Sequence, residues 1–330
     1  MKRRTFLSAA LMAAGLTATA IVPAAAQDNY PEREVIVVVP WAAGGGADVG
    51  ARIIFDALSK KFGKAFVLDF RPGASGTVGS ATVVRAPADG YMLDFTSGAP
   101  LVNALFMPQG VPYDPTTDLL PVALATTTST SIAASASAPF NTLDEMVAWS
   151  KANPGKLNAA VSGVGGNAHA AISQIAYKTG AEILIVPYGG QGAMVADMMG
   201  GVTHIGSGFP SGFEPGVESG KLKWIMVMQP ERDPLYPDIP SVDESSFKGK
   251  NLYNSSWLAL FAPKGTPRPI IDTLNAAINE YISSPEGKEK LAGAGFSATP
   301  GTPEDLAKRL EVERTNMKAL IDAGAFKMGG

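Results

Sequence analysis

At two places in the chain, a strand-like apolar run leads directly into a glycine-rich loop and then into a helical pattern. The first unit runs from Val35 to Asp48 and the second from Leu157 to His169. Strands of this kind alternating with loops and helices predict an α/β protein with mostly parallel sheets. Each glycine loop would leave the free N–H groups of a helix N-terminus beside the carboxyl end of a strand, where they favour an anion. Two such helix N-termini facing each other would bind a small acid.

The first residues predict export. Residues 1–26 combine a basic start with a weakly apolar run and an Ala-x-Ala ending, which is the pattern of a cleaved secretory signal peptide. The pair Arg3-Arg4 also fits the twin-arginine signal, so both the Tat and the Sec route stay open. The apolar run is shorter than a typical membrane span. We therefore expect the mature chain to be soluble.

Composition excludes several kinds of site. The chain contains no cysteine, which removes disulfides, zinc–thiolate sites and thiol catalysis. The net charge of −3 becomes more negative when the basic signal segment is removed, so neither nucleic acid nor an anionic membrane surface is an expected partner. The length and the 46% of hydrophobic residues fit about two domains.

Motifs for a nucleotide or for catalysis are incomplete. Gly163 to Ala168 has the spacing G-x-G-x-x-A of a dinucleotide loop, but the acidic residue expected after the next strand is missing, since Glu182 precedes that strand. His169 and His204 carry no metal-binding or triad motif. We expect no cofactor, no metal and no catalytic residue. A secreted hydrolase or isomerase that uses one of these histidines is the alternative function.

A series of short motifs extends over almost the whole mature chain. They are Tyr30-Pro31, Val38 to Asp48 with Ala51-Arg52, Arg71 to Ala74, Asp89 to Tyr91, Tyr113 to Pro115, Ala152 to Leu157, Ser162 to Gly165 with His169, Val186 to Gly190, Gly220 to Leu222, and Trp257 followed by Ala262-Pro263. In this order and spacing they resemble the extracytoplasmic solute receptors of tripartite tricarboxylate transporters, the TctC-like or Bug-type receptors.

The resemblance implies a periplasmic-binding-protein fold of type II, with two α/β lobes that two crossovers join and that close around a ligand. Residues 1–26 would be the signal peptide, residues 27–126 plus 255–330 the first lobe, and residues 127–254 the second. The implied protein is a periplasmic monomer without catalytic activity. It would bind a dicarboxylate, a tricarboxylate or an aromatic acid and deliver it to the membrane components of a tripartite transporter. A sensor kinase as the receiving partner stays open.

The resemblance also implies which residues contact the ligand through loop amides, hydroxyls and ordered water. In the first lobe these are Trp41, Ala43, Gly44, Gly45, Gly46, Ala74, Ser75, Gly76, Thr96 and Ser97. In the second lobe they are Ser162, Gly163, Val164, Gly165, Gly166, His169, Tyr188, Gly189, Ser207 and Gly208.

Some residues in this set or next to it bear on the choice of ligand. Relatives often have aspartates at the positions of His204 and Gly208, and the second of these helps to select the ligand, so its absence favours a plain or aromatic carboxylate over an amino acid. His169 either lines the anion site or bonds to its own loop. Trp41 and Phe209 either stack on an aromatic acid or pack as walls.

Overall fold

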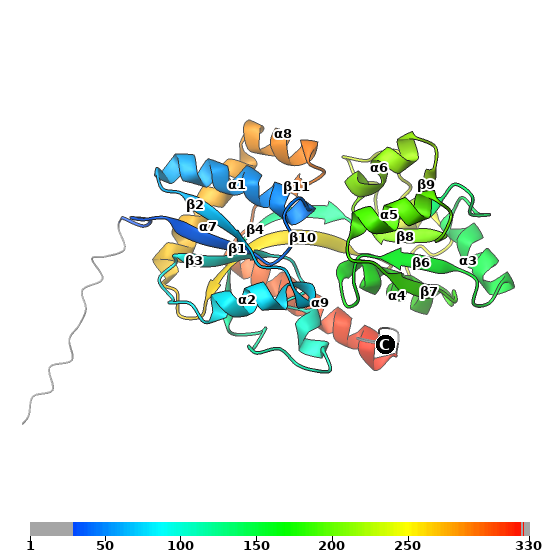
Figure 1. Cartoon of the computed structure of the whole chain (residues 1–330), viewed down its shortest axis with the longest axis horizontal. Helices are drawn as coiled ribbons and strands as arrows, with labels where there is room; N and C mark the ends of the chain where they lie inside the picture. Colours follow the sequence, from blue (N-terminus) through cyan, green and yellow to red (C-terminus); the bar gives the residue numbers. More distant parts are fainter. Residues whose placement is uncertain (1–28, 325, 327–330) are drawn as a thin grey trace, which may run out of the picture.

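The computed structural model describes residues 29–324 and 326, which form two separate β-sheets with helices on both faces (Figure 1). The first sheet has the strand order β11-β4-β10-β3-β1-β2, and the second has the order β7-β6-β8-β5-β9. The expected α/β class is therefore confirmed. The predicted signal peptide lies outside the described residues.

The first sheet is built around the predicted β-branched strand, β1 (Val35–Val39). β1 pairs in parallel with β2 (Phe66–Phe70) and β3 (Met92–Thr96). β10 (Ser255–Pro263) pairs antiparallel with β3 and with β4 (Leu119–Ser129), and the short β11 (Ser297–Ala298) extends the sheet beyond β4. The parallel strands thus precede the glycine loops, while the antiparallel β4 leads to the second lobe and β10 returns from it.

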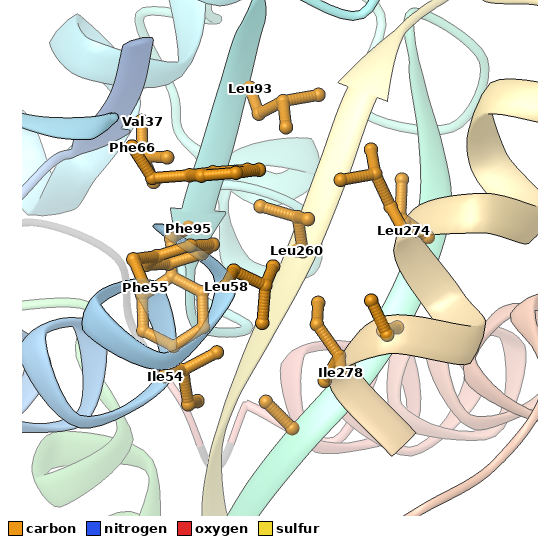
Figure 2. Close-up of a cluster of buried hydrophobic side chains, with 14 of the residues drawn as sticks. Val37, Ile54, Phe55, Leu58, Phe66, Leu93, Phe95, Leu260, Leu274 and Ile278 are labelled. Atoms are coloured by element: carbon orange, nitrogen blue, oxygen red, sulfur yellow. The ribbon is translucent and has the colours of Figure 1, made fainter. Parts of the chain in front are cut away.

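Helices bury opposite faces of the first sheet. α1 (Gly46–Phe62) and α7 (Arg268–Ser283) cover one face, while α2 (Thr77–Val84) and α9 (Pro303–Asp322) cover the other. Figure 2 shows how Phe55 and Leu58 of α1 meet Phe95 and Leu260 of the sheet. The rings of Phe55 and Phe95 pack edge to face with centroids 5.1 Å apart. Such burial of apolar side chains is the main stabilising contribution to a chain without disulfides.

The second sheet repeats this arrangement. β6 (Asn158–Val161) is parallel to β7 (Leu184–Pro187) and β8 (Ile205–Gly208), whereas β5 (Ser131–Ser135) is antiparallel to β8 and β9 (Leu222–Val227). α3 (Leu143–Ala152) and α4 (Asn167–Thr179) cover one face, and α5 (Gln191–Met199) and α6 (Pro210–Glu218) cover the other. Met194 and Met198 of α5 are fully buried and belong to the core between α5, α6 and the sheet.

The apolar run Ile183 to Val186 predicts a buried strand, but this prediction is wrong, since β7 lies at the sheet edge and Leu184 is 59% exposed. The helical spacing of Val49, Ile53, Leu58 and Phe62 predicts a helix that ends at Gly63, and this helix is confirmed, although Val49 itself is exposed. The buried face of α1 is formed instead by Ala51, Ile54, Phe55 and Leu58.

The chain crosses between the sheets at two adjacent points. Thr130 separates β4 from β5, and Asn254 directly precedes β10. The Thr130 hydroxyl donates to Asn254 Oδ1 at 2.7 Å, and Met228 bonds to both backbones at 2.8 Å. The two crossovers are therefore tied together side by side.

The remaining elements are short or peripheral. They are the 3₁₀ helices η2 (Ala74–Gly76), η3 (Asn103–Phe106) and η4 (Val242–Glu244), and α8 (Pro285–Gly293). In the part of the chain that the structure describes, no helix combines the length and the apolar character needed to cross a bilayer.

Candidate functional site

The first glycine loop leads into the N-terminus of α1. Gly44 has a positive φ of 85° and Gly45 caps the helix in extended conformation. The buried Asp48 accepts a hydrogen bond from the Gly44 amide at 2.8 Å through Oδ2, while its Oδ1 lies 2.6 Å from Arg52 Nε. Asp48 thus orders the loop, as expected from its position in the first helical turn. Because Arg52 balances its charge, Asp48 leaves the helix start suited to an anion.

The second loop of the first lobe has a strained backbone. Ala74 and Ser75 adopt left-handed φ angles of 43° and 54°, and Gly76 follows with φ 92°. A Cβ at Gly76 would lie 2.8 Å from Pro100 Cγ and 3.2 Å from Trp41 Cζ2, so only glycine fits. Trp41 therefore packs against this loop as a wall. Left-handed residues other than glycine often occur at ligand-binding loops.

The loops of the two lobes meet directly. Ser75 Oγ donates to the Val164 carbonyl at 3.3 Å, and Asn103 Nδ2 donates to the Gly165 carbonyl. The structure therefore brings the predicted segments Ala74–Gly76 and Ser162–Gly166 together. Asn103 was not among the predicted residues, because it lies in the short η3 turn and belongs to no motif.

The hydrogen bonds of both histidines go to groups of the second lobe. His169 is buried, and its Nδ1 accepts a hydrogen bond from the Gly165 amide at 3.0 Å. Its ring lies 4.8 Å from that of Phe326, and burial lowers the pKa of His169. This contact to its own loop is one of the two arrangements that the sequence left open. The His204 ring packs at a tilt against that of Trp149 and contacts Asn158 Oδ1, and burial lowers the pKa of His204 as well.

A pocket of about 180 Å³ opens where the first glycine loop meets the start of α6. Its lining comes from both lobes and consists of Gly44, Gly45, Gly46, Val49, Thr128, Phe209, Ser211, Gly212, Ala294, Gly295 and Phe296. Three of these residues, Gly44 to Gly46, were predicted as ligand contacts. Only Phe209 among the others had been considered from the sequence. Periodicity gave no signal for Thr128 or Phe296, because both reach the pocket from distant elements.

The remaining predicted residues lie at different depths. Thr96 and Ser207 are fully buried, and their hydroxyls have no hydrogen-bond partner among the described residues. The Tyr188 hydroxyl donates to Asp197 of its own lobe at 2.8 Å. Ser97 and Gly163 are half-buried, and the exposed ones are Ala43, Ser162 and Gly189. Within residues 29–324 and 326, no group of three His, Cys, Asp or Glu side chains is placed to hold a metal ion.

Gln191, which sequence reasoning missed, shapes the region around Gly208. Its Nε2 donates to the Phe209 carbonyl at 2.9 Å, and its Oε1 accepts from the Phe209 amide at 3.2 Å. A Cβ at Gly208 would lie only 2.7 Å from Gln191 Nε2, and one at Gly212 only 2.3 Å from it. The amide of Gln191 thus occupies the space that a side chain at position 208 would need.

Sequence comparisons find relatives along most of the chain. The profile described as "Tripartite tricarboxylate transporter family receptor" matches residues 50–325. BugT of Bordetella pertussis is 32% identical over 279 residues, which cover 84% of this chain and 85% of that protein. A protein from the tcbD–tcbE intergenic region of Pseudomonas sp. strain P51 is 32% identical over 295 residues, which cover 89% of this chain and 87% of that protein.

Solved structures share the fold. Rpa4515 of R. palustris, solved with adipate, superposes with a TM-score of 0.83 at 28% identity, covering 90% of this chain and 99% of that one. MatC (Rpa3494) of Rhodopseudomonas palustris, solved with bound malate, gives a TM-score of 0.79 at 27% identity, covering 88% and 100%. The periplasmic binding protein BugD gives a TM-score of 0.79 at 29% identity, covering 90% and 100%. The expected two-lobed fold of type II periplasmic binding proteins is confirmed.

Proposed function

The chain belongs to the tripartite tricarboxylate transporter receptor family, and from this premise we propose that it captures a small carboxylate between its lobes in the periplasm. It then delivers the ligand to the membrane components of a transporter. The observation that carries this proposal is the pocket at the N-terminus of α1, which residues of both lobes line. Elsewhere between the lobes, Ser75 and Asn103 bond to the second glycine loop. Relatives solved with adipate and with malate support a carboxylate as the ligand class.

The carboxylate is received by backbone amides. The N–H groups at the start of α1 have no carbonyl acceptor in their own helix, and the dipole of a 17-residue helix adds partial positive charge there. Water bridges complete the hydrogen bonding of such a ligand at little cost. A salt bridge with arginine is therefore not required for binding.

In this proposal the site binds its ligand and catalyses no reaction. His169 Nδ1 is occupied by the Gly165 amide, and His204 contacts the side-chain amide of Asn158. Neither arrangement orients an imidazole for proton transfer in the way that a buried carboxylate does. Incubating each bound acid with the protein and following its NMR spectrum tests this point. Product formation that disappears in His169→Ala or His204→Ala would instead establish the alternative, a hydrolase or isomerase.

Ligand binding is tested by thermal unfolding of the mature protein with mono-, di- and tricarboxylates. A ligand at about 100 times its Kd adds about 2.7 kcal/mol of stability, so Tm should rise by roughly 5 °C. Calorimetric titration of each stabilising acid then gives the Kd. If no carboxylate of the panel raises Tm, the proposed function is wrong.

A further inference from the structure

Helix α9 near the end of the chain is anchored to the first lobe by polar contacts. Trp257 Nε1 on β10 donates to both carboxylate oxygens of Glu313, at 2.8 and 3.0 Å. Arg314 donates to the Leu101 carbonyl at 3.1 Å and to the Pro115 carbonyl at 2.6 Å. α9 therefore moves together with the first sheet in any motion of the lobes.

Beyond α9 the chain contacts the second lobe. Figure 1 shows this helix extending from the first sheet toward the second lobe. Phe326 is 2% exposed, and its ring centroid lies 4.8 Å from that of His169 on α4. Ala170, the next residue of α4, belongs to the same buried apolar cluster as Phe326 and the inner face of α9. A side chain that follows α9 is thus buried against the helix that begins after the second glycine loop.

His169 connects this contact to the second glycine loop. Its Nδ1 accepts a hydrogen bond from the Gly165 amide at 3.0 Å, so the imidazole is neutral and carries its hydrogen on Nε2. Burial lowers the pKa of His169 and favours the same neutral form. The ring cannot move without disturbing either Phe326 or the Gly165 amide. Each of these two partners therefore restrains the other through His169.

Opening of the lobes would disturb this contact. The crossovers join the lobes at Thr130 and Asn254, and a rotation there shifts α4 relative to α9. Phe326 would then become exposed to water, which is unfavourable in proportion to the apolar area uncovered. The hydrogen bond from Asn103 to the Gly165 carbonyl would be lost in the same motion. The open arrangement is therefore disfavoured even when no ligand bridges the lobes.

Resting on the proposed function, we propose that the pair of Phe326 and His169, here called the clasp, is a third link between the lobes that holds them near the closed arrangement before a ligand binds. His169 is a positioning residue in this link, because it contacts Phe326 on one side and the second glycine loop on the other. A receptor that is already close to its bound arrangement loses less binding free energy to closure. The clasp thus raises the affinity for the carboxylate without touching it.

The absence of cysteine from the chain allows the distance between the lobes to be measured without ligand. Val67→Cys and Val202→Cys place one spin label on an exposed site of each lobe, and pulsed electron paramagnetic resonance measures their separation. Phe326→Leu should broaden the distance distribution of the labelled parent. Phe140→Leu is the matched control, because its ring packs against Trp149 within the second lobe, and it should leave the distribution unchanged. No broadening in Phe326→Leu, or equal broadening in the control, would overturn the inference.

Hydrogen exchange of the Gly165 amide, followed by NMR, tests the role of His169. Phe326→Leu should speed this exchange by about fivefold, although residue 326 does not contact the loop. His169→Asn offers Oδ1 to the same amide but has no ring. In that background Phe326→Leu should therefore cause no further change, because the two residues act as one unit. Additive effects of the two substitutions would contradict the link through His169.

Titration with adipate, malate and the other acids of the panel separates this inference from the proposed function. The Kd of an acid that binds the wild type should rise by about fivefold in Phe326→Leu and stay unchanged in Phe140→Leu. An unchanged Kd in Phe326→Leu would overturn the inference and leave the proposed function intact. If no acid binds the wild type, the proposed function fails, whereas the distance and exchange measurements still decide whether the clasp exists.

Discussion

At the scale of single residues, Asp94 lies in an unusually apolar place for a carboxyl group. It is fully buried in β3, between Val38 and Phe261 of the neighbouring strands, and neither of its carboxyl oxygens has a hydrogen-bond partner among the described residues. Burial raises its pKa from 3.8 to about 7. Between these two values the folded protein keeps the proton and the unfolded chain loses it. Stability therefore falls as the pH rises through this window.

Asp94→Asn should remove this dependence, because asparagine has nearly the same shape and does not ionise. We expect the variant to gain on the order of 2 kcal/mol relative to the wild type between pH 5 and pH 8. Urea unfolding at both pH values measures the difference. Asp56→Asn on the exposed side of α1 is the control and should show no such gain. A wild type that loses no stability relative to Asp94→Asn at pH 8 would contradict the prediction.

Replacing Gly46 by proline would remove a single backbone N–H at the start of α1. Proline is well suited to the first helical position, and the preceding Gly45 is already extended, with φ −91° and ψ 175°. Gly46→Pro should therefore fold normally but weaken carboxylate binding by about tenfold through loss of one charge-assisted hydrogen bond. Gly46→Ala adds a Cβ at the same position and keeps the N–H. Calorimetry should show a smaller loss for alanine, and equal losses would indicate a steric effect.

At the scale of elements, close packing of α2 depends on one glycine. A Cβ on Gly79 would lie 2.6 Å from Pro40 Cβ and 2.9 Å from the Arg71 carbonyl oxygen. Gly79→Ala should destabilise the protein by about 2 kcal/mol, since the backbone must move. Gly293→Ala in α8 meets no atom within 4 Å and should be neutral or slightly stabilising. Denaturant unfolding compares the two, and similar free energies would refute the packing argument.

The sequence predicts those elements whose pattern is set by their own residues. β1 and its glycine loop follow from continuous β-branched residues, and Gly63 ends α1 with the expected positive φ of 63°. The edge position of β7 was not predictable, because the number of neighbouring strands is not encoded in the strand itself. α8 escaped prediction since only Gly287 and Leu291 are buried in it, which leaves no apolar period.

The candidate site, too, could be predicted only in part from the sequence. Its glycine loops could be found from local sequence, but the residues that meet them could not. Asn103 reaches Gly165 across 62 positions of the chain, and Gln191 fills the space beside Gly208 only because α5 and α6 pack together. Phe296 joins the pocket through the last part of the chain. Such contacts depend on the packing of the lobes.

At the scale of the whole molecule, closure should depend on the contacts between lobes. Asn103→Ala removes a bond that exists only when the lobes meet, and a hydrogen bond contributes about 1 kcal/mol net. Ligand affinity should therefore fall on the order of fivefold. Asn153→Ala removes a similar side-chain bond, to the Trp149 carbonyl at 3.0 Å, within the second lobe, and should leave affinity unchanged. Equal effects of both variants on the Kd would argue against a role in closure.

Solution scattering measures closure directly. The radius of gyration should decrease when ligand binds, as in other hinged two-lobe proteins. In Asn103→Ala the ligand-free protein should be more open than the wild type, whereas at saturating ligand both should reach the same radius. A radius that does not respond to ligand would show that the lobes do not move.

The paired crossovers have a consequence for how the chain acquires its structure. All strands of the second sheet come from one uninterrupted stretch, Ser131 to Val227, whereas β10 and β11 of the first sheet follow much later. During synthesis the second sheet can therefore assemble first, while the edges of β3 and β4 stay unpaired until β10 has been made. Unpaired strand edges promote aggregation, so binding by a chaperone should protect this protein most before residues 255–263 are synthesised.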